Sequence, residues 1–451
     1  MRKIQKTDSI YKGFIAIVTP ITIQYLMSSL VSASDAFMLG FLDQSSLSAS
    51  SLATQVAFVY SLFYGAFVFG LNVLAAQYWG KGDVSAVSRV LAITLRYSLL
   101  IGLLFTVSTL VFPGQIMTLF TNDAMLIKIG AEYLRVVSIS YMLTGFSQSY
   151  LGCMKICDRA GLSSFIGSSA VIINIVLNAI FIFGLMGVPK MGVAGAALAT
   201  VCARIFEVVC IIISVTKGLC PKAGLKNLFI NEKELHKDYW KYTVPLLINQ
   251  LGWGGGVTMY SVIMGHLGTD AVAANSIATI VRTIIASFCW GVSSGVGIII
   301  GNTLGRGELE KAKKMGGKYV RLSIYIGIVS GIVILMLIPV VTSVITLSLQ
   351  ATDYLKVMLM FSAYYIIGNS LNSTIIAGIF PAGGDTKFGM ICDVVTLWCV
   401  VVPLGLLAAF VWELPVLVVA FILTLDEFVK LPAVYIHYMK YQWVKNITRQ
   451  R

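Results

Sequence analysis

Long apolar segments separated by short charged loops constrain this chain more than any other feature of its sequence. Each segment has about 20 residues or more, the length of a helix that crosses roughly 30 Å of hydrocarbon. Of the 451 residues 57% are hydrophobic and only 12% are charged, whereas about a quarter of a soluble domain is charged. Spanning strands would be about 10 residues long and would alternate polar with apolar side chains, a pattern not seen here. The sequence therefore predicts an all-α integral membrane protein.

The apolar segments predict twelve transmembrane helices, and the distribution of positive charge supports that number. Lys and Arg gather at the N-terminus, in every second loop and at the C-terminus, while the opposite loops hold only Lys128, Lys190 and Lys356. Because positively charged loops stay on the cytoplasmic side, we expect both termini in the cytoplasm and the protein in the cell membrane, inner or plasma. Topology also explains the net charge of +13, so we expect no nucleic acid partner. The expected spans are residues 14–42, 52–77, 90–112, 127–151, 162–186, 192–216, 240–265, 273–301, 319–346, 355–380, 388–411 and 414–438.

The two halves of the sequence are related by an internal repeat. A shift of 225 residues, without a gap, aligns prolines, glycines and loop-flanking positions. Because the shift spans six helices, an even number, both halves enter the membrane from the same side and the repeat is parallel. We expect two pseudo-symmetric six-helix lobes, residues 1–215 and 242–451, joined by a polar cytoplasmic connector at 216–241. The aligned pairs include Pro20 with Pro245, Gly40 with Gly265, Gly70 with Gly295, Gly80 with Gly305 and Gly82 with Gly307.

One aspartate, Asp35 in "SASDAFMLG", stands near the end of the first apolar segment with no basic residue in that segment. A carboxylate at the centre of a membrane helix is unfavourable by roughly 2.5 to 3.5 kcal/mol on insertion scales. Helical spacing places Gln24, Ser28 and Ser32 on the same stripe as Asp35. Small residues at a tight helix contact would also explain the serines. The carboxylate is more than packing requires, and we expect it to face the bundle interior or a water-filled cavity.

Further polar residues in the first half could join Asp35. In "INIVLNAIFIFG", Asn174 and Asn178 are four residues apart on one helix face, and the next span carries Thr200. Carbonyl, hydroxyl and carboxylate oxygens suit a hard cation such as Na⁺. Hydrogen bonding between helices is an equally good explanation from spacing alone. Arg204 and Glu207 are expected to form a self-neutralising pair near their helix end, mirrored by Glu427 and Lys430 in the second half.

The spans of the second half carry amides and aromatic rings where the first half has Asp35. These side chains could line a substrate cavity or could simply pack between helices. Asp393 and Arg282 are intramembrane charges for which the sequence gives no partner. The candidate cavity residues are Gln24, Ser28 and Ser32 in the first half and Asn249, Trp253, Tyr260 and Asn369 in the second, with Gln250 and Asn372 nearby.

The sequence motifs that would indicate an enzyme have better explanations in this chain. "GVSSG", Gly291 to Gly295, fits the G-x-S-x-G motif, but the repeat aligns Gly295 with Gly70, so we assign these glycines to a small-residue packing face. The turn "AQYWGKGD" is not a phosphate loop, because Ala75 stands where Walker A needs glycine. The eight cysteines lie mostly in apolar segments without a CxxC pair and read as packing residues. We expect no enzyme activity and no cofactor.

The chain resembles the multidrug and toxic compound extrusion (MATE) family over nearly its whole length. The resemblance is carried by Pro20 with "SDAFMLG", by "AQYWGKGD", by "INIVLNAIFIFG" with "GVPKMGVAGAALAT", and by "LDEFVK" with "YQWVKNITR". It implies twelve helices in two lobes around a V-shaped cavity, and export of organic cations in exchange for Na⁺ or H⁺.

The resemblance also implies a cation-coupling site made of Asp35, Asn174, Asn178 and Thr200, with Na⁺ at Asp35 as the possible metal. Many relatives have aspartate where this chain has Asn178, which leaves one formal charge and shifts weight from Na⁺ binding towards a protonation switch. Some relatives carry second-lobe acids where Gln250, Trp253, Asn369 and Ser370 stand here, so we expect no mechanism that depends on a second-lobe site.

The sequence thus favours a monomeric antiporter that exports organic cations or amphipathic compounds by alternating access. A proton or Na⁺ arriving at Asp35 would disfavour the drug-bound conformation. The alternative is a lipid or lipid-linked intermediate flippase of related two-lobed design. A flippase would need a cationic cavity for phosphate head groups, and the spans offer mainly Arg135, Arg204, Arg282 and Lys430.

Overall fold

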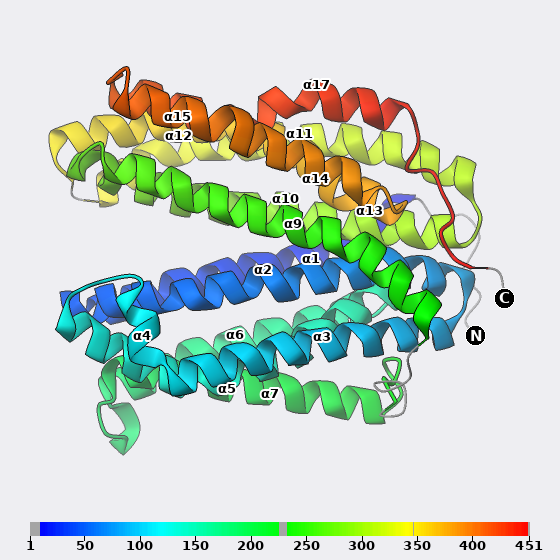
Figure 1. Cartoon of the computed structure of the whole chain (residues 1–451), viewed down its shortest axis with the longest axis horizontal. Helices are drawn as coiled ribbons and strands as arrows, with labels where there is room; N and C mark the ends of the chain where they lie inside the picture. The colour runs from blue at the N-terminus through cyan, green and yellow to red at the C-terminus, as the bar shows by residue number, and fades with distance from the viewer. Residues whose placement is uncertain (1–9, 225–231, 346, 450–451) are drawn as a thin grey trace. The chain divides into compact units, whose positions relative to one another are not determined.

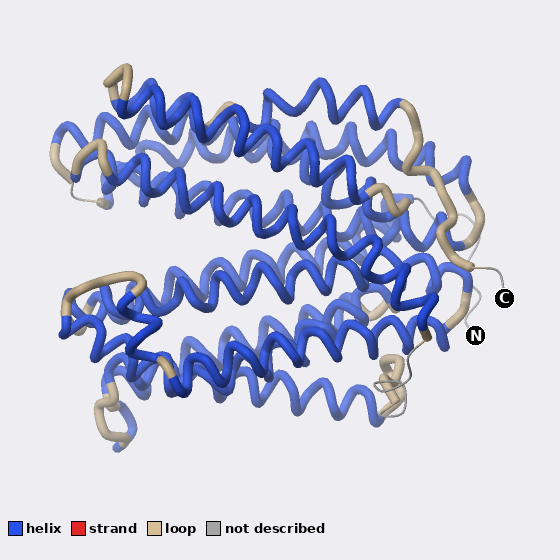
Figure 2. The backbone as a smooth tube through the Cα atoms, viewed as in Figure 1, coloured by secondary structure: helices blue, strands red, loops and turns tan. Residues whose placement is uncertain are grey.

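The computed structural model describes residues 10–224, 232–345 and 347–449, with the side chains of residues 10–12, 32, 33, 35–37 and 40 excepted. Throughout these residues the chain forms helices joined by turns and short loops, and Figure 2 shows no strand among them. The absence of strands in this part of the chain agrees with the all-α class predicted from segment length.

Within the described residues, twelve helical segments correspond to the twelve predicted spans and confirm their number (Figure 1). Two short elements, α4 and η1, lie in loops of the first half, and several spans of the second half consist of more than one element. The first half contains α1 (Ile10–Gly40), α2 (Gln44–Lys81), α3 (Val84–Val111), α4 (Pro113–Thr118), α5 (Ala124–Ile156), α6 (Ala160–Phe183), η1 (Leu185–Gly187) and α7 (Gly192–Thr216). The second half contains α9 (Lys233–Gly265), α10 (Thr269–Gly305), α11 (Leu309–Val344), α12 (Leu349–Asn372), η2 (Ser373–Ile379), α13 (Phe380–Ala382), α14 (Thr386–Val395), η3 (Thr396–Val401), α15 (Val402–Phe410), α16 (Val416–Leu423) and α17 (Asp426–Met439).

The exposed surface of these helices is apolar, as a bilayer requires. On α3, for example, Leu100, Leu103, Leu104 and Val107 are all about half exposed, an arrangement that water would disfavour and lipid favours. Among the described residues, eight segments are long and apolar enough to cross a membrane by length and composition. Of the remaining four spans, α5, α9 and α12 carry more polar or charged side chains, and the last is divided into α16 and α17, which are 8 and 14 residues long.

The helix boundaries repeat with the period found in the sequence. The shift that aligns the two halves relates the start of α2 at Gln44 to that of α10 at Thr269, and the start of α3 at Val84 to that of α11 at Leu309. The same shift relates the N-caps of α5 and α12, where Asp123 accepts from the amide of Met125 at 2.8 Å and Ser348 accepts from that of Ala351 at 3.0 Å. Side-chain oxygens at these positions satisfy amides that have no partner within the helix. The parallel repeat is therefore confirmed in the structure.

The chain forms two compact units. The first comprises the described residues up to Tyr25, Ala76–Lys81 and the described residues from Lys241 onward; the second comprises Leu26–Ala75 and Gly82–Trp240. Compared with the predicted lobes, the start of α1 and the end of α2 are grouped with the second half. The predicted connector, residues 216–241, includes residues 225–231, which lie outside the described residues.

In the second unit α3 lies alongside α5, and α6 alongside α7. Buried tyrosines join α2 to α5 in the same unit, where the hydroxyl of Tyr60 on α2 donates to the carbonyl of Tyr141 on α5 at 2.6 Å. Several buried serines and threonines of α5 also face this interior. A polar interior with an apolar exterior explains why α5 is less apolar than the helices around it.

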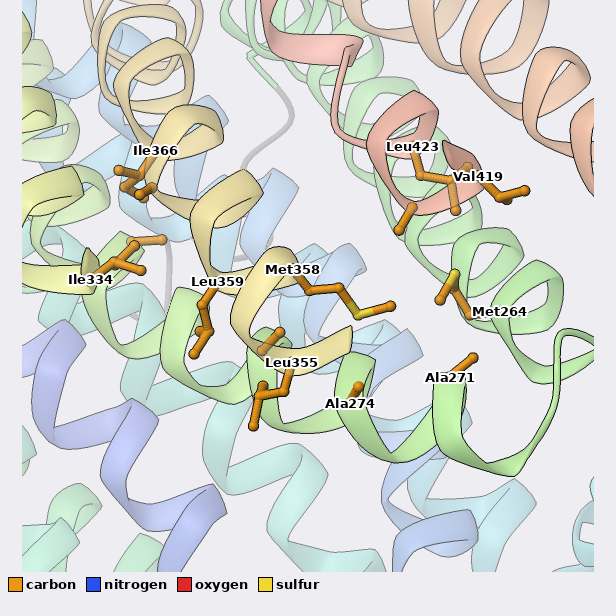
Figure 3. Close-up of a cluster of buried hydrophobic side chains, with 14 of the residues drawn as sticks. Met264, Ala271, Ala274, Ile334, Leu355, Met358, Leu359, Ile366, Val419 and Leu423 are labelled. Carbon is orange, nitrogen blue, oxygen red and sulfur yellow. The ribbon is translucent and has the colours of Figure 1, made fainter. Parts of the chain in front are cut away.

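One apolar core of the first unit is formed by side chains of α9, α10, α11, α12 and α16 (Figure 3). Ile334 of α11 and Leu355, Leu359 and Ile366 of α12 are fully buried there, and Val419 of α16 closes the cluster. The contacts hold in place α12, from which polar residues described below project, and α16, which directly precedes α17.

The glycines of α10 form the small-residue packing face that the repeat predicted. A Cβ on Gly291 would overlap Thr22, one on Gly295 would overlap Val18, and one on Gly305 would overlap the carbonyl of Gln77. The Ser293 hydroxyl donates to the carbonyl of Ser373 at 2.6 Å. "GVSSG" is therefore a packing motif that lets α1 and α2 approach α10 closely.

The later helices of the two halves differ in continuity. In the first half α5, α6 and α7 each run without interruption. In the second half π-helical segments, η2 and η3, interrupt the corresponding spans, and the last span, predicted at 414–438, is divided between α16 and α17 at Thr424 and Leu425. Such interruptions in membrane helices occur where neighbouring protein satisfies the freed backbone groups, and often at functional positions.

Replacing Gly305 with alanine tests the close approach of α10 to the end of α2. The added methyl group would overlap the Gln77 carbonyl, so we expect G305A to lose about 1 to 3 kcal/mol of stability. Thermal unfolding of the purified protein in detergent measures this. Gly317 on α11 has nothing within 4 Å of an added Cβ, so G317A is the matched control and should be as stable as the parent or slightly more. Equal stability of the two variants would contradict the close approach of α10 to the end of α2.

Candidate functional site

The structure brings three of the predicted site residues of the first half into one hydrogen-bonded chain. The Asn178 amide donates to Asn174 Oδ1 at 3.2 Å, and the Asn174 amide donates to Thr200 Oγ1 at 3.4 Å. The Thr200 hydroxyl in turn donates to the carbonyl of Ala196 at 3.1 Å. Asn174 and Asn178 are buried. The chain links α6 to α7, which is what interhelical hydrogen bonding requires, and its oxygens also suit a cation.

The side chains of Asp35 and Ser32 lie outside the described residues, although their backbone continues α1. Of the other stripe residues, Gln24 is buried within the first unit and Ser28 is exposed within the second. The predicted cation-coupling site, including Na⁺ at Asp35, therefore stays a prediction.

Further along α7 lies the predicted ion pair. Arg204 Nη1 lies 2.8 Å from Glu207 Oε2, and Glu207 is almost fully buried. The hydroxyl of Ser147 on α5 donates to the same carboxylate oxygen at 2.7 Å. The pairing of Arg204 with Glu207 is confirmed, and a second helix contributes to it.

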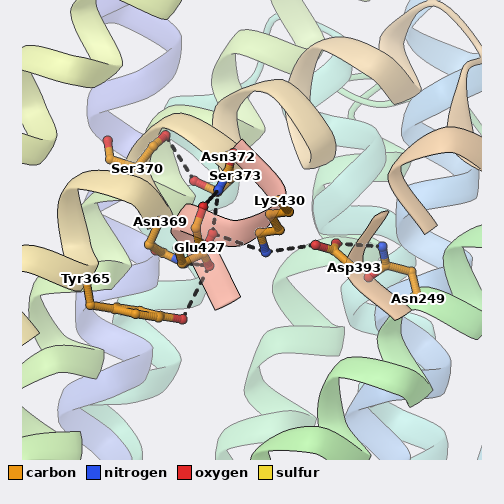
Figure 4. Close-up of polar contacts among 9 residues, drawn as sticks. All are labelled: Asn249, Tyr365, Asn369, Ser370, Asn372, Ser373, Asp393, Glu427 and Lys430. Atoms are coloured by element: carbon orange, nitrogen blue, oxygen red, sulfur yellow. Dashed lines mark hydrogen bonds and ion pairs between the residues drawn. The ribbon is translucent and has the colours of Figure 1, made fainter. Parts of the chain in front are cut away.

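A larger charged cluster lies in the second half, centred on Glu427 of α17 (Figure 4). The amide of Asn369 donates to Glu427 Oε1 at 2.9 Å, and the amide of Asn372 donates to Glu427 Oε2 at 2.8 Å and to its backbone carbonyl at 2.6 Å. The hydroxyl of Tyr365 also donates to Oε1 at 3.3 Å. Three residues of α12 thus hold one buried carboxylate in a fixed orientation.

Lys430 connects this carboxylate to a second one on α14. Its Nζ lies 3.1 Å from Glu427 Oε2 and 2.8 Å from Asp393 Oδ1, and the lysine side chain is only 10% exposed. The amide of Asn249 on α9 donates to Asp393 Oδ2 at 2.8 Å. The structure therefore confirms the Glu427 to Lys430 pair and supplies the partner of Asp393 that the sequence did not reveal.

Two further charges complete the cluster. The guanidinium of Arg282 on α10 lies 4.9 Å from the centre of the Tyr365 ring, as a cation–π contact. Asp426, beside Glu427 in the first turn of α17, is only 6% exposed, and its Oδ1 has no hydrogen-bond partner within the described part of the chain. The cluster thus contains three carboxylates and two basic groups.

Local backbone structure places these charges. The break between α16 and α17 creates a helix N-terminus inside the membrane span, and Asp426 and Glu427 occupy its first turn. The partial positive charge of a helix N-terminus stabilises carboxylates there. η2 begins directly after Asn372, and η3 begins three residues after Asp393. These interruptions of the second half therefore lie next to residues of the cluster.

Sequence reasoning placed two members of this cluster, Asn249 and Asn369, in a tentative substrate cavity. Both donate to acidic side chains of other helices, and their place in a substrate cavity stays a prediction. Trp253 lies near Trp290, with ring centres 6.5 Å apart and planes at 90°, and the hydroxyl of Tyr260 is buried without a hydrogen-bond partner among the described residues. The signal that could have found the cluster is the number of intramembrane charges in the second half, because buried charges must find partners.

Comparison with known proteins decides the family. The MatE family model matches residues 20–180 and 245–407, once in each half and from starting points that correspond in the repeat. This chain belongs to the MatE family. MatE membership accounts for the twelve spans and the parallel repeat, and it places the protein among multi-pass membrane transporters.

Curated relatives and solved structures support the same assignment. A Bacillus subtilis relative described as the uncharacterized transporter YisQ is 25% identical over 410 residues, covering 89% of this chain and 87% of the relative. A Bradyrhizobium diazoefficiens relative described as the probable multidrug resistance protein NorM is 24% identical, covering 87% and 85%. The structure of a MOP superfamily transporter from Pyrococcus furiosus superimposes over 96% of both chains with a TM-score of 0.87 at 18% identity, a likeness of fold.

The contribution of the α12 amides to this MatE protein can be tested at Asn372. N372A removes two hydrogen bonds to Glu427, one of them to its buried carboxylate. Since a hydrogen bond to a charged group contributes about 1.5 to 3 kcal/mol, we expect the unfolding free energy to fall by about 2 kcal/mol or more. The comparison is S343A, which removes an exposed hydroxyl bonded within its own helix and should change stability by less than about 0.5 kcal/mol. If both variants unfold at the same temperature, Asn372 does not stabilise Glu427.

Proposed function

We propose that this MatE protein is a secondary active multidrug efflux transporter, exporting organic cations or amphipathic compounds by alternating access in exchange for H⁺ or Na⁺. The observation that carries the proposal is the match of the MatE family model to both halves. Relatives described as probable multidrug resistance proteins, which align over most of this chain, support export of drugs as the activity.

Asp35 is the residue to which we assign coupling, with Asn174, Asn178 and Thr200 as neighbours that supply oxygens. The hydrogen-bonded chain through the last three supports a polar site in the first half. One charge moving through about 100 mV supplies roughly 2.3 kcal/mol, enough for about a fiftyfold gradient at about 1.4 kcal/mol per tenfold. One titrating or cation-binding carboxylate is therefore sufficient to drive export.

Three of the four intramembrane basic residues named from the sequence favour efflux of cations over transport of a lipid phosphate. Arg204 and Lys430 are bound to carboxylates, and Arg282 contacts an aromatic ring. A basic side chain that is committed to a buried acid is not available to a phosphate head group. We place the protein in the cell membrane with both termini in the cytoplasm, following the distribution of Lys and Arg, and we expect it to act as a monomer.

The proposal is tested by efflux of ethidium from cells that express the protein, with Na⁺ and pH gradients imposed separately. The parent should export ethidium under one of the two gradients, which identifies the ion. D35N, expressed to the same level, should lose gradient-driven export because the amide carries no charge. D353N is the control, since Asp353 is an exposed acid paired with Lys356, and it should export normally.

Two results would count against the proposal in different ways. If the parent exports no organic cation under either gradient, the substrate class is wrong. If the parent exports ethidium and D35N does so equally well, the transporter stands but Asp35 is not its coupling residue.

A further inference from the structure

The environment of the Lys430 ammonium is that of a bound cation. Two carboxylate oxygens from different helices, Asp393 Oδ1 and Glu427 Oε2, lie 2.8 and 3.1 Å from it. The remaining carboxylate oxygens accept from neutral groups, Asn249 on one side and Asn369 on the other. The acids are therefore oriented by amides, while the positive charge between them comes from a single side chain.

The same region has buried oxygens that lack hydrogen bonds. Within the part of the chain that the structure describes, Oδ1 of Asn369, Oδ1 of Asn372 and Oδ1 of Asp426 are all buried without a donor. These three residues are at least nine-tenths buried. Unsatisfied buried acceptors are costly, so these oxygens are available to an inorganic cation and its water once the lysine is removed.

We propose that this second-half cluster is a binding site for a small monovalent cation, and that the Lys430 ammonium permanently fills the position of that cation. With Lys430 in that position, Asp393 and Glu427 have a basic partner without an inorganic ion. Removal of the lysine would turn the cluster into a site for Na⁺, K⁺, Li⁺ or a proton.

The first half neutralises its buried glutamate in a related way, with different residues. Glu207 pairs with Arg204, which precedes it by three residues, whereas Glu427 pairs with Lys430, which follows it by three. Ser147 and Asn372, which occupy equivalent positions in the repeat, each donate to the glutamate of their own half. Because the basic residues do not correspond in the repeat, the pairing is not simply inherited from it, and each half has its own tethered cation.

Removal of Lys430 would leave buried carboxylates of the cluster without their basic partner. The cluster would retain three carboxylates, Asp393, Asp426 and Glu427, with Arg282 as the remaining basic group. Leaving a buried charge without its partner is strongly destabilising. A cation or a proton that enters the vacated position reduces this cost, and stability then rises with the logarithm of its concentration.

The experiment measures thermal unfolding of purified full-length K430M in detergent. NaCl, KCl and LiCl are compared with choline chloride at equal ionic strength, at mildly alkaline and mildly acidic pH. We expect K430M to unfold at a lower temperature than the parent in choline chloride at alkaline pH. Its unfolding temperature should rise with the concentration of at least one of the three metal ions, or on acidification. The parent and K430R, which keeps the positive charge, should respond equally to choline and to the metal ions.

The matched control is K356M, which breaks an exposed lysine–aspartate pair and should not make unfolding depend on a particular cation. E427Q/K430M removes one carboxylate as well as the lysine, so its response should be weaker than that of K430M. If K430M does not yield folded protein, the same unfolding measurements are made on E427Q/K430M. Equal unfolding temperatures in choline, Na⁺, K⁺ and Li⁺, with no gain on acidification, would overturn the proposal. Since unfolding requires no transport, this result is independent of the efflux assay.

Discussion

The hydrocarbon core of a membrane offers no water to a charge or to a backbone amide, and the structure follows from that constraint. Every spanning segment must satisfy its backbone internally, so the spans are helices. An intramembrane charge is costly unless it pairs within the protein or faces a water-filled cavity. In the second half this requirement is met by a cluster that joins α9, α12, α14 and α17 through Glu427, Lys430 and Asp393. The charges that are costly in lipid are thus used to hold several helices together.

The two halves solve the same problem with different backbones. Both place a buried glutamate in their last span and both hold it with a side chain at an equivalent position, Ser147 or Asn372. In the first half the helices that carry these residues are continuous. In the second half they are interrupted by η2, by η3 and by the break before α17, each next to a member of the charged cluster. More charges in one place require more donors, and an interrupted helix offers free backbone groups and an N-terminal dipole in addition to side chains.

This arrangement bears on how a MatE transporter of this kind could be driven. Charges that are bound to one another within a half are not available to a moving ion or to a substrate. The second-half acids are of this type, because Lys430 lies between them. A carboxylate without a basic neighbour in its own segment, as Asp35 is in the sequence, is the better candidate for exchange with an ion. The two halves therefore differ in that Asp393 and Glu427 of the second are bound to a lysine, whereas the first has an acid with no basic residue in its own segment.

The sequence by itself determined the class of fold, the number of spans and the repeat. Segment length, loop charge and a fixed period can all be read along the chain without knowing which residues are close in space. It also found the pairs Arg204 with Glu207 and Glu427 with Lys430, since residues three apart share a helix face. Only the tertiary structure decided the partner of Asp393, the orientation of Glu427 by Asn369 and Asn372, and the break that puts Asp426 at a helix N-terminus. These contacts join residues far apart in the sequence and on different helices, and helix rotation and packing, which no local pattern encodes, bring them together.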